Sequence, residues 1–160
     1  MVDDAPSARS GMAKLVCFYL HGQEYAADIN DIKETMLVRP ITHVFLTPSW
    51  LSGIINLRGD IVAVIDLAQL LGLPPTALTD TSRIVITTHR GKVGGILVDR
   101  MAELRNLATD ELQPAPPVLS AEGAALLRGV VTLDGGEAVR VLNLANLFES
   151  ERLRAFQRAT

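Results

Sequence analysis

The chain has 160 residues, of which 48% are hydrophobic and 21% are charged, and its net charge is −3. This balance indicates one compact unit or two small ones with a real core, and it excludes a disordered chain. It also disfavours nucleic-acid binding, because Lys and Arg are scattered and a phosphate backbone needs a concentrated basic face.

The first 13 residues are small and polar and are broken by Pro6 and Gly11, so we expect residues 1–13 to form a flexible tail. This segment lacks the apolar stretch of a secretory signal peptide, and no apolar run approaches the roughly 20 residues of a membrane span. The single cysteine, Cys17, lies in an apolar run and is predicted to be a small buried side chain. These features are typical of a cytoplasmic protein.

Short strands separated by turn signals follow the tail. They are rich in Val, Ile, Thr and Tyr, and their connections are too short to hold the crossover helices of parallel βαβ units. The strand candidates are residues 15–20, 24–29, 36–46, 53–57, 61–65, 84–88, 92–98, 101–107, 129–133 and 137–142.

Helix is sparse. A short helix is predicted after Asp66, which would cap it, and a second in the segment AEGAALLRG. The only long helical pattern starts at Asn143, which could cap it, and runs to the end of the chain. Its inward-facing residues would be Leu144, Leu147, Phe148, Leu153 and Phe156.

The chain contains an internal duplication. The segment GIINLRGDIVAVIDLAQLL from Gly53 matches GVVTLDGGEAVRVLNLANLF from Gly129, with one extra residue in the second copy. The segments from Lys14 and from Arg83 also match, since each is an apolar strand, a glycine turn and a second strand. The resulting order, A-B-A′-B′, predicts two similar small β units packed against each other as sandwiches or small barrels.

No catalytic group or metal site is recognisable in the sequence. His21, His43 and His89 are far apart, and none has a partner at a metal-ligand spacing. The carboxylates are dispersed, which favours a solvated face over an acid–base pair. A small β enzyme would need such a pair, so the sequence predicts no enzyme, no metal and no cofactor.

The tripeptide Arg58-Gly59-Asp60 lies between two candidate strands, where it is either an adhesion signal or a tight turn. Adhesion would require secretion, whereas glycine and aspartate are common in hairpin turns. The second copy keeps this scaffold but carries Thr-Leu-Asp-Gly at 132–135, so folding does not demand Asn56 or Arg58. Arg58 is therefore either a specific contact, with Glu34 or with a partner's carboxylate, or an ordinary solvated arginine.

The segment GIINLRGDIVAVIDLAQLLGL resembles the signature of the CheW-like domain family, in which a Gly-Val-Ile-Asn-Leu-Arg-Gly turn precedes an apolar strand and an Asp-Leu helix start. Ala63 stands where the family often has proline, and ETMLVRP at 34–40 is a loose match. The resemblance covers about residues 14–150 through the further blocks CFYLHGQEYAADINDIKE, TPSWLSG, GGILVDRMAEL, ELQPAPP and LRGVVTLDGGEAVRVLNLANLF.

The resemblance implies a mainly β fold of two intertwined SH3-like five-stranded β-barrel subdomains over residues 14–150, with residues 151–160 ending a C-terminal helix. It implies a non-enzymatic adaptor of bacterial chemotaxis that binds the regulatory domain of a CheA-type histidine kinase and the cytoplasmic tip of chemoreceptors. Such a protein would be cytoplasmic, at membrane receptor arrays, without direct membrane insertion and without nucleic acid.

An alternative is an adaptor of a related motility pathway, twitching or gliding, including a paralogue that binds receptor and not kinase. By matching positions, the resemblance places six residues where family members contact these partners or support the contacts, with Leu57 and Asp60 included as neighbours. The six are Ile32, Glu34, Gly53, Asn56, Arg58 and Gly59.

Overall fold

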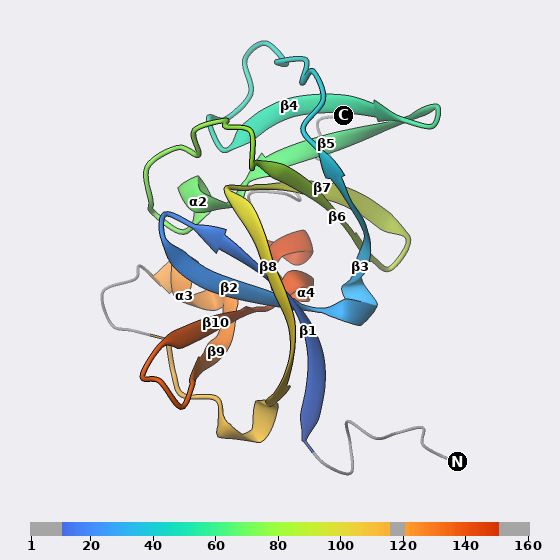
Figure 1. The fold of residues 1–160 in the computed structure, drawn as a ribbon. Helices are drawn as coiled ribbons and strands as arrows, with labels where there is room; N and C mark the ends of the chain where they lie inside the picture. The colour runs from blue at the N-terminus through green and yellow to red at the C-terminus, as the bar shows by residue number, and fades with distance from the viewer. Residues whose placement is uncertain (1–10, 116–120, 151–160) are drawn as a thin grey trace.

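The computed structural model describes residues 11–115 and 121–150, and within them the chain is mainly β (Figure 1). Five short helical segments connect the strands: η1 (Ile29–Asp31), α2 (Leu67–Leu70), η2 (Thr109–Glu111), α3 (Ala121–Ala125) and α4 (Leu144–Glu149). The strands are β1 (Met12–Leu20), β2 (Gln23–Asp28), β3 (Ile32–Leu37), β4 (Leu51–Leu57), β5 (Asp60–Asp66), β6 (Arg83–His89), β7 (Lys92–Val98), β8 (Arg100–Ala108), β9 (Leu127–Thr132) and β10 (Ala138–Leu142).

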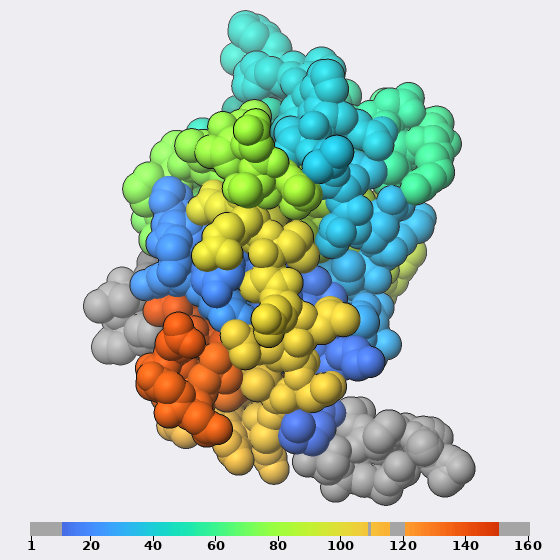
Figure 2. Space-filling view, viewed as in Figure 1, coloured from blue at the N-terminus to red at the C-terminus, as the bar shows by residue number. Residues whose placement is uncertain are grey.

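The two halves of the chain exchange strands. The order is β8-β1-β2-β10-β9 in one five-stranded sheet, here called sheet A, and β3-β6-β7-β5-β4 in the other, sheet B. Each sheet takes one hairpin from one half and three strands from the other, and the parallel pairs β2–β10 and β5–β7 join the halves. Figure 2 accordingly shows β8, in yellow, lying beside blue amino-terminal and orange carboxy-terminal residues. The predicted intertwined, mainly β fold is confirmed.

Three apolar clusters fill this fold. One lies within sheet A and includes Leu15 and Cys17, and a second lies within sheet B. The largest cluster combines residues of both sheets with α2 and α4, and Phe18 and Leu20 of β1 belong to it. Alternate residues of β1 therefore enter different clusters, which explains why this strand is apolar on both faces.

The predicted strand at 36–46 is wrong over most of its length. β3 ends at Leu37, and residues 38–50 form a loop that pairs with sheet B through a single bridge between Thr42 and Ile54. The segment has the β-branched composition of a strand, but Pro40 and Pro48 have no N–H to contribute to a ladder.

The predicted cap by Asp66 is confirmed in position but not in its side-chain bond. Asp66 precedes α2, but its side chain makes no capping bond to the helix. Its buried carboxylate instead accepts hydrogen bonds from the backbone N–H and the hydroxyl of Thr76, at 2.9 and 2.8 Å, and from Gln69 Nε2 at 2.9 Å. The residue thus ties the loop after α2 to the end of β5.

At the other helix the prediction is confirmed, since the side chain of Asn143 accepts a hydrogen bond from the N–H of Asn146 and caps α4. The helix ends at Glu149 because Ser150 has an extended backbone, and Leu153, Phe156 and the rest of 151–160 lie outside the described residues. β1 begins at Met12, two residues inside the expected tail, of which residues 1–10 are not described. The predicted inward-facing side chains that the structure describes, Leu144, Leu147 and Phe148, are buried.

Two glycines at equivalent positions in the two copies let a loop backbone pass close to a strand. Gly53 has a φ of +148° and Gly129 a φ of +154°, and a Cβ added there would lie 2.3 Å from the carbonyl oxygen of Thr42 and 2.5 Å from that of Gln113. These close approaches allow paired backbone hydrogen bonds, Thr42 with Ile54 and Gln113 with Val130, at 2.8–2.9 Å. The duplicated glycine therefore has a backbone role in both copies.

We predict that Gly53→Ala and Gly129→Ala each lower the free energy of unfolding by about 2 kcal/mol or more, because the new methyl group meets a carbonyl oxygen in a backbone conformation that disfavours alanine. Chemical denaturation measures the change. Gly135→Ala is the matched control, since no atom lies within 4 Å of its added Cβ. An equal loss in the control, or no loss in the first two variants, would contradict this role.

Candidate functional site

The Arg-Gly-Asp segment is a hairpin turn. Arg58 and Gly59 have φ values of +51° and +92°, which is the pattern of a two-residue type I′ turn between β4 and β5. Asn56 stabilises it, because its Oδ1 accepts a hydrogen bond from the N–H of Gly59 at 2.9 Å. The same positive-φ pairs occur in the β1–β2 and β6–β7 turns, at residues 21–22 and 90–91. The β4–β5 turn therefore has the same two-residue backbone conformation as the other two hairpin turns.

Arg58 makes a bidentate ion pair with Glu34. Its Nη1 and Nη2 donate to the two carboxylate oxygens at 2.7 and 2.9 Å. Glu34 lies on β3 and Arg58 follows β4, and these are the two edge strands of sheet B. The pair therefore joins the edges of the sheet, and it is the Glu34 contact considered from the sequence.

The ion pair fixes the charges of both groups. The hydrogen bonds from Arg58 lower the pKa of Glu34, and those to Glu34 raise the pKa of Arg58. The Arg58 side chain remains 66% exposed, against 25% for Glu34. A guanidinium held by a rigid carboxylate but open to solvent presents its remaining donors in a fixed direction, which suits recognition of a second molecule.

An open pocket of about 400 Å³ adjoins this turn. Ile61 is 64% exposed and Val93 is 36% exposed, so two apolar side chains lie on this surface among charged ones. A second arginine, Arg39, donates from Nη1 to the carbonyl oxygen of Asn56 at 2.9 Å. The described residues that line the pocket are Lys33, Leu57, Arg58, Asp60, Ile61, Val62, Gly91 and Val93.

The structure brings most of the predicted site residues to one end of sheet B, which we call the Arg58 end. Ile32 and Gly53 stand apart from it: Ile32 packs against the largest apolar cluster, and Gly53 serves the Thr42 crossing. Sequence reasoning missed Lys33, Arg39, Ile61 and Val93, although an apolar residue on the outward face of an alternating strand was a usable signal for Ile61. The residues at the Arg58 end are Glu34, Asn56, Leu57, Arg58, Gly59 and Asp60.

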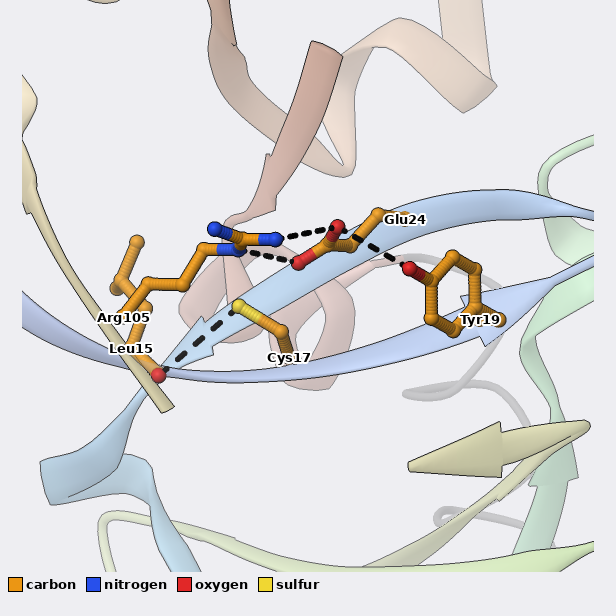
Figure 3. A network of polar contacts seen from close by, with 5 residues as sticks. All are labelled: Leu15, Cys17, Tyr19, Glu24 and Arg105. Atoms are coloured by element: carbon orange, nitrogen blue, oxygen red, sulfur yellow. Dashed lines mark hydrogen bonds and ion pairs between the residues drawn. The ribbon is translucent and has the colours of Figure 1, made fainter. Parts of the chain in front are cut away.

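A buried polar network lies in sheet A (Figure 3). Glu24 on β2, whose side chain is 7% exposed, accepts hydrogen bonds from Arg105 Nε and Nη2 on β8 at 2.6 and 3.2 Å. The hydroxyl of Tyr19 lies 3.5 Å from the same carboxylate. The network ties edge strand β8 across β1 to β2, so its role is structural.

Cys17 lies beside this ion pair and is buried, as predicted. Burial, and after it the negative charge of Glu24, raises the pKa of the Cys17 thiol to about 12. Its Sγ lies 4.0 Å from the carbonyl oxygen of Leu15. Such a thiol stays protonated at neutral pH and is a poor nucleophile, so the network lacks an activated catalytic group.

Across residues 11–115 and 121–150, no three His, Cys, Asp or Glu side chains are grouped so that they could hold a metal ion. Over the same residues, no helix has the length and apolar character needed to cross a membrane. The arrangement at the Arg58 end, an anchored guanidinium beside an open pocket of mixed charged and apolar lining, is suited to binding another molecule.

Paired β-barrels with an exposed, anchored charge at one end are suited to a recognition domain. A family model for the CheW-like domain matches residues 14–152. The crystal structure of scaffolding protein TtCheW from Thermoanaerobacter tengcongensis matches with a TM-score of 0.77 at 33% identity, covering 88% of this chain and 90% of that one.

Two relatives extend the comparison. A probable chemotaxis protein CheW from Rhizobium etli is 31% identical over 128 residues, which cover 80% of this chain and 83% of the relative. Protein FrzA from Myxococcus xanthus is 27% identical over 143 residues, 89% of each chain. The chain belongs to the CheW-like domain family.

We predict that Cys17 resists alkylation by iodoacetamide at pH 8 in the folded protein and reacts fully in guanidinium chloride. Its folded-state pKa of about 12 leaves almost no thiolate at that pH, whereas unfolding restores the ordinary value of 9.0. Mass spectrometry after timed labelling measures both rates. Rapid modification of the folded chain at pH 8 would contradict the buried placement.

We predict that Arg105→Met destabilises the protein by about 3–5 kcal/mol, because it leaves the buried Glu24 carboxylate without its cation. The double variant Glu24→Leu/Arg105→Met removes both charges and should recover most of that loss. Denaturant unfolding of the two variants and the original chain tests this. Equal destabilisation of the single and double variants would show that packing, and not the unpaired charge, is responsible.

Proposed function

We propose that this protein couples chemoreceptors to a CheA-type histidine kinase without catalysing a reaction itself. It would work in the cytoplasm, bound to membrane receptor arrays through the cytoplasmic receptor tip and to the regulatory domain of the kinase. Membership of the CheW-like family supports this, as does the likeness to a chemotaxis protein and to a protein described as scaffolding.

The observation that carries the proposal is the exposed guanidinium of Arg58, held by Glu34 next to the pocket at Ile61 and Val93. A prearranged charged group loses little conformational entropy on binding, so more of its interaction appears as affinity. The neighbouring apolar surface supplies the non-directional part of the contact, and the charge fixes orientation.

Different predicted residues would serve this contact differently. Arg58 and Asp60 carry the charges that a partner can reach, whereas Glu34 orients the guanidinium and Asn56 with Gly59 shapes the turn. Leu57 is 5% exposed and Gly53 sits at the loop crossing, so both support the surface from within. Ile32 packs against the largest apolar cluster and would support β3 from within.

A second candidate is an adaptor role in a related motility pathway, twitching or gliding. It is favoured by the likeness to protein FrzA, whose name, unlike those of the CheW relatives, does not mention chemotaxis. The match spans 89% of both chains. The two candidates use the same domain and differ in the partners, including a form that binds receptor and not kinase.

Calorimetric titration of the full chain with the regulatory domain of its own organism's CheA-type kinase, and with a receptor-tip fragment, tests the proposal. We expect dissociation constants in the micromolar range, about −8 kcal/mol, for both. Binding to the receptor fragment alone would identify a receptor-only paralogue, and binding to neither would refute the coupling role.

We predict that Arg58→Glu weakens partner binding about tenfold or more while the midpoint of thermal unfolding falls only slightly, because the Arg58–Glu34 pair that it breaks is open to solvent and such pairs contribute little to stability. The matched control is Arg128→Glu, a reversal at an exposed arginine on β9 of sheet A. The swapped variant Glu34→Arg/Arg58→Glu should not restore binding, since the partner would meet an inverted pair. Unchanged affinity for both partners would exclude Arg58 from the interface.

A further inference from the structure

A polar hollow of about 330 Å³ lies at the opposite end of β7 from the pocket at Gly91 and Val93. Its walls come from three segments: the β1–β2 turn, the loop before β6 and the short link between β7 and β8. The hollow is therefore separate from the Arg58 end. The described residues that line it are His21, Ala77, Thr79, Thr81, Asp99 and Arg100.

Hydrogen bonds between these segments hold the walls in place. The N–H of His21 donates to Asp99 Oδ2 at 2.7 Å, and the N–H of Asp99 donates to the carbonyl oxygen of Tyr19 at 3.0 Å. The ring of His21 donates from Nε2 to the carbonyl oxygen of Pro74 at 2.7 Å. The hydroxyl of Thr81 donates to the carbonyl oxygen of Asp99 at 2.9 Å. The hollow is thus formed before any ligand arrives.

The positive charge at the hollow is a guanidinium in a fixed position. Arg100 lies over the ring of Tyr19, with its Cζ 3.8 Å from the ring centroid, and the hydroxyl of Tyr19 lies 3.5 Å from Glu24 in the network of Figure 3. Arg100 is exposed, and among the described residues none accepts a hydrogen bond from its guanidinium or forms an ion pair with it. A stacked guanidinium keeps its N–H donors at its edge, where they match the two oxygens of a carboxylate.

Asp99 places a negative charge at the same hollow. Its Oδ2 accepts from the N–H of His21, but within the part of the chain that the structure describes no donor bonds to its Oδ1. Asp99 and Arg100 are neighbours in the sequence, yet their side chains do not pair with each other. Because Nε2 of His21 carries the proton donated to Pro74, Nδ1 of the neutral ring is a further acceptor.

Two charges of opposite sign that share a preformed hollow without pairing are complementary to a ligand that carries both charges. We propose that this hollow binds the zwitterionic backbone of a free α-amino acid. The carboxylate of the ligand accepts from the edge N–H groups of Arg100, and its ammonium donates to Asp99 Oδ1 and His21 Nδ1. A simple anion would be repelled by Asp99 and a simple cation by Arg100, so neither fits as well.

The size and openness of the hollow set the expected affinity. About 330 Å³ is at the lower end of the roughly 300–1,000 Å³ of small-molecule pockets, so the site suits a small amino acid. Arg100 and His21 are exposed, so water weakens each charged contact. We expect a dissociation constant of about 1 mM. This binding does not depend on the proposed coupling role.

Two-dimensional NMR of the isotope-labelled full chain, titrated with L-alanine to about 20 mM, tests the proposal over the range of weak binding. The amide resonances of His21, Thr81 and Asp99 should shift and saturate together. N-acetyl-L-alanine lacks the ammonium and L-alaninamide lacks the carboxylate, so each should bind about tenfold more weakly or worse. Titration with sodium chloride is the control for ionic strength.

Two variants separate the charges. Arg100→Gln removes the guanidinium, and Asp99→Asn removes the negative charge but keeps an oxygen that can accept from the N–H of His21. Each should weaken L-alanine binding about tenfold or more, with an unfolding midpoint close to that of the original chain. Arg128→Gln, at an exposed arginine on β9, is the matched control and should bind as the original chain does.

Three results would overturn the proposal: no saturable shift with L-alanine, equal binding of L-alanine and its two blocked analogues, or unchanged binding in both variants. Binding of acetate as strong as that of L-alanine, lost in Arg100→Gln and kept in Asp99→Asn, would also overturn it, because Arg100 would then be a simple anion site.

Discussion

The fold depends on two parallel strand pairings, β2 with β10 and β5 with β7, which join the first half of the chain to the second. Each sheet is completed by a hairpin from the other half, and the largest apolar cluster draws on both sheets. Neither half can bury its apolar strands alone, so the two barrels form one cooperative unit. The positions of every loop and turn on the surface follow from this exchange.

Both barrels have an arginine–carboxylate pair at an edge strand, but the two pairs have different roles. In both, the edge strand that follows the exchanged hairpin is held by an arginine–carboxylate pair: β8 by Arg105 with Glu24, and β3 by Glu34 with Arg58. In sheet A the carboxylate is buried and the pair is structural, whereas in sheet B the arginine faces solvent. The second copy cannot present an equivalent group, because its turn carries Asp134 and two glycines. The two copies thus share one structural frame, and only the first carries the surface that we propose for recognition.

The sequence predicted the parts that depend on local pattern. Alternating apolar residues located nine of the ten strands, and comparing the copies singled out Arg58 and the Glu34 contact. The strand predicted at 36–46 is wrong because its β-branched composition did not show that, between Pro40 and Pro48, only Thr42 would pair with sheet B. The side-chain cap by Asp66 is absent because the Asp66 carboxylate bonds to Thr76 instead. The hairpin exchange came from the family resemblance alone, since the order A-B-A′-B′ permits pairing within each half.

In the proposed function, this chain is a passive coupler whose surfaces make a receptor and a kinase act as one unit. The most direct measurement is the autophosphorylation rate of the CheA-type kinase on membranes that contain its receptor, with and without this protein. We expect a receptor ligand to change the kinase rate only when the protein is present. A rate that responds equally to ligand without the protein, or that never responds, would contradict it.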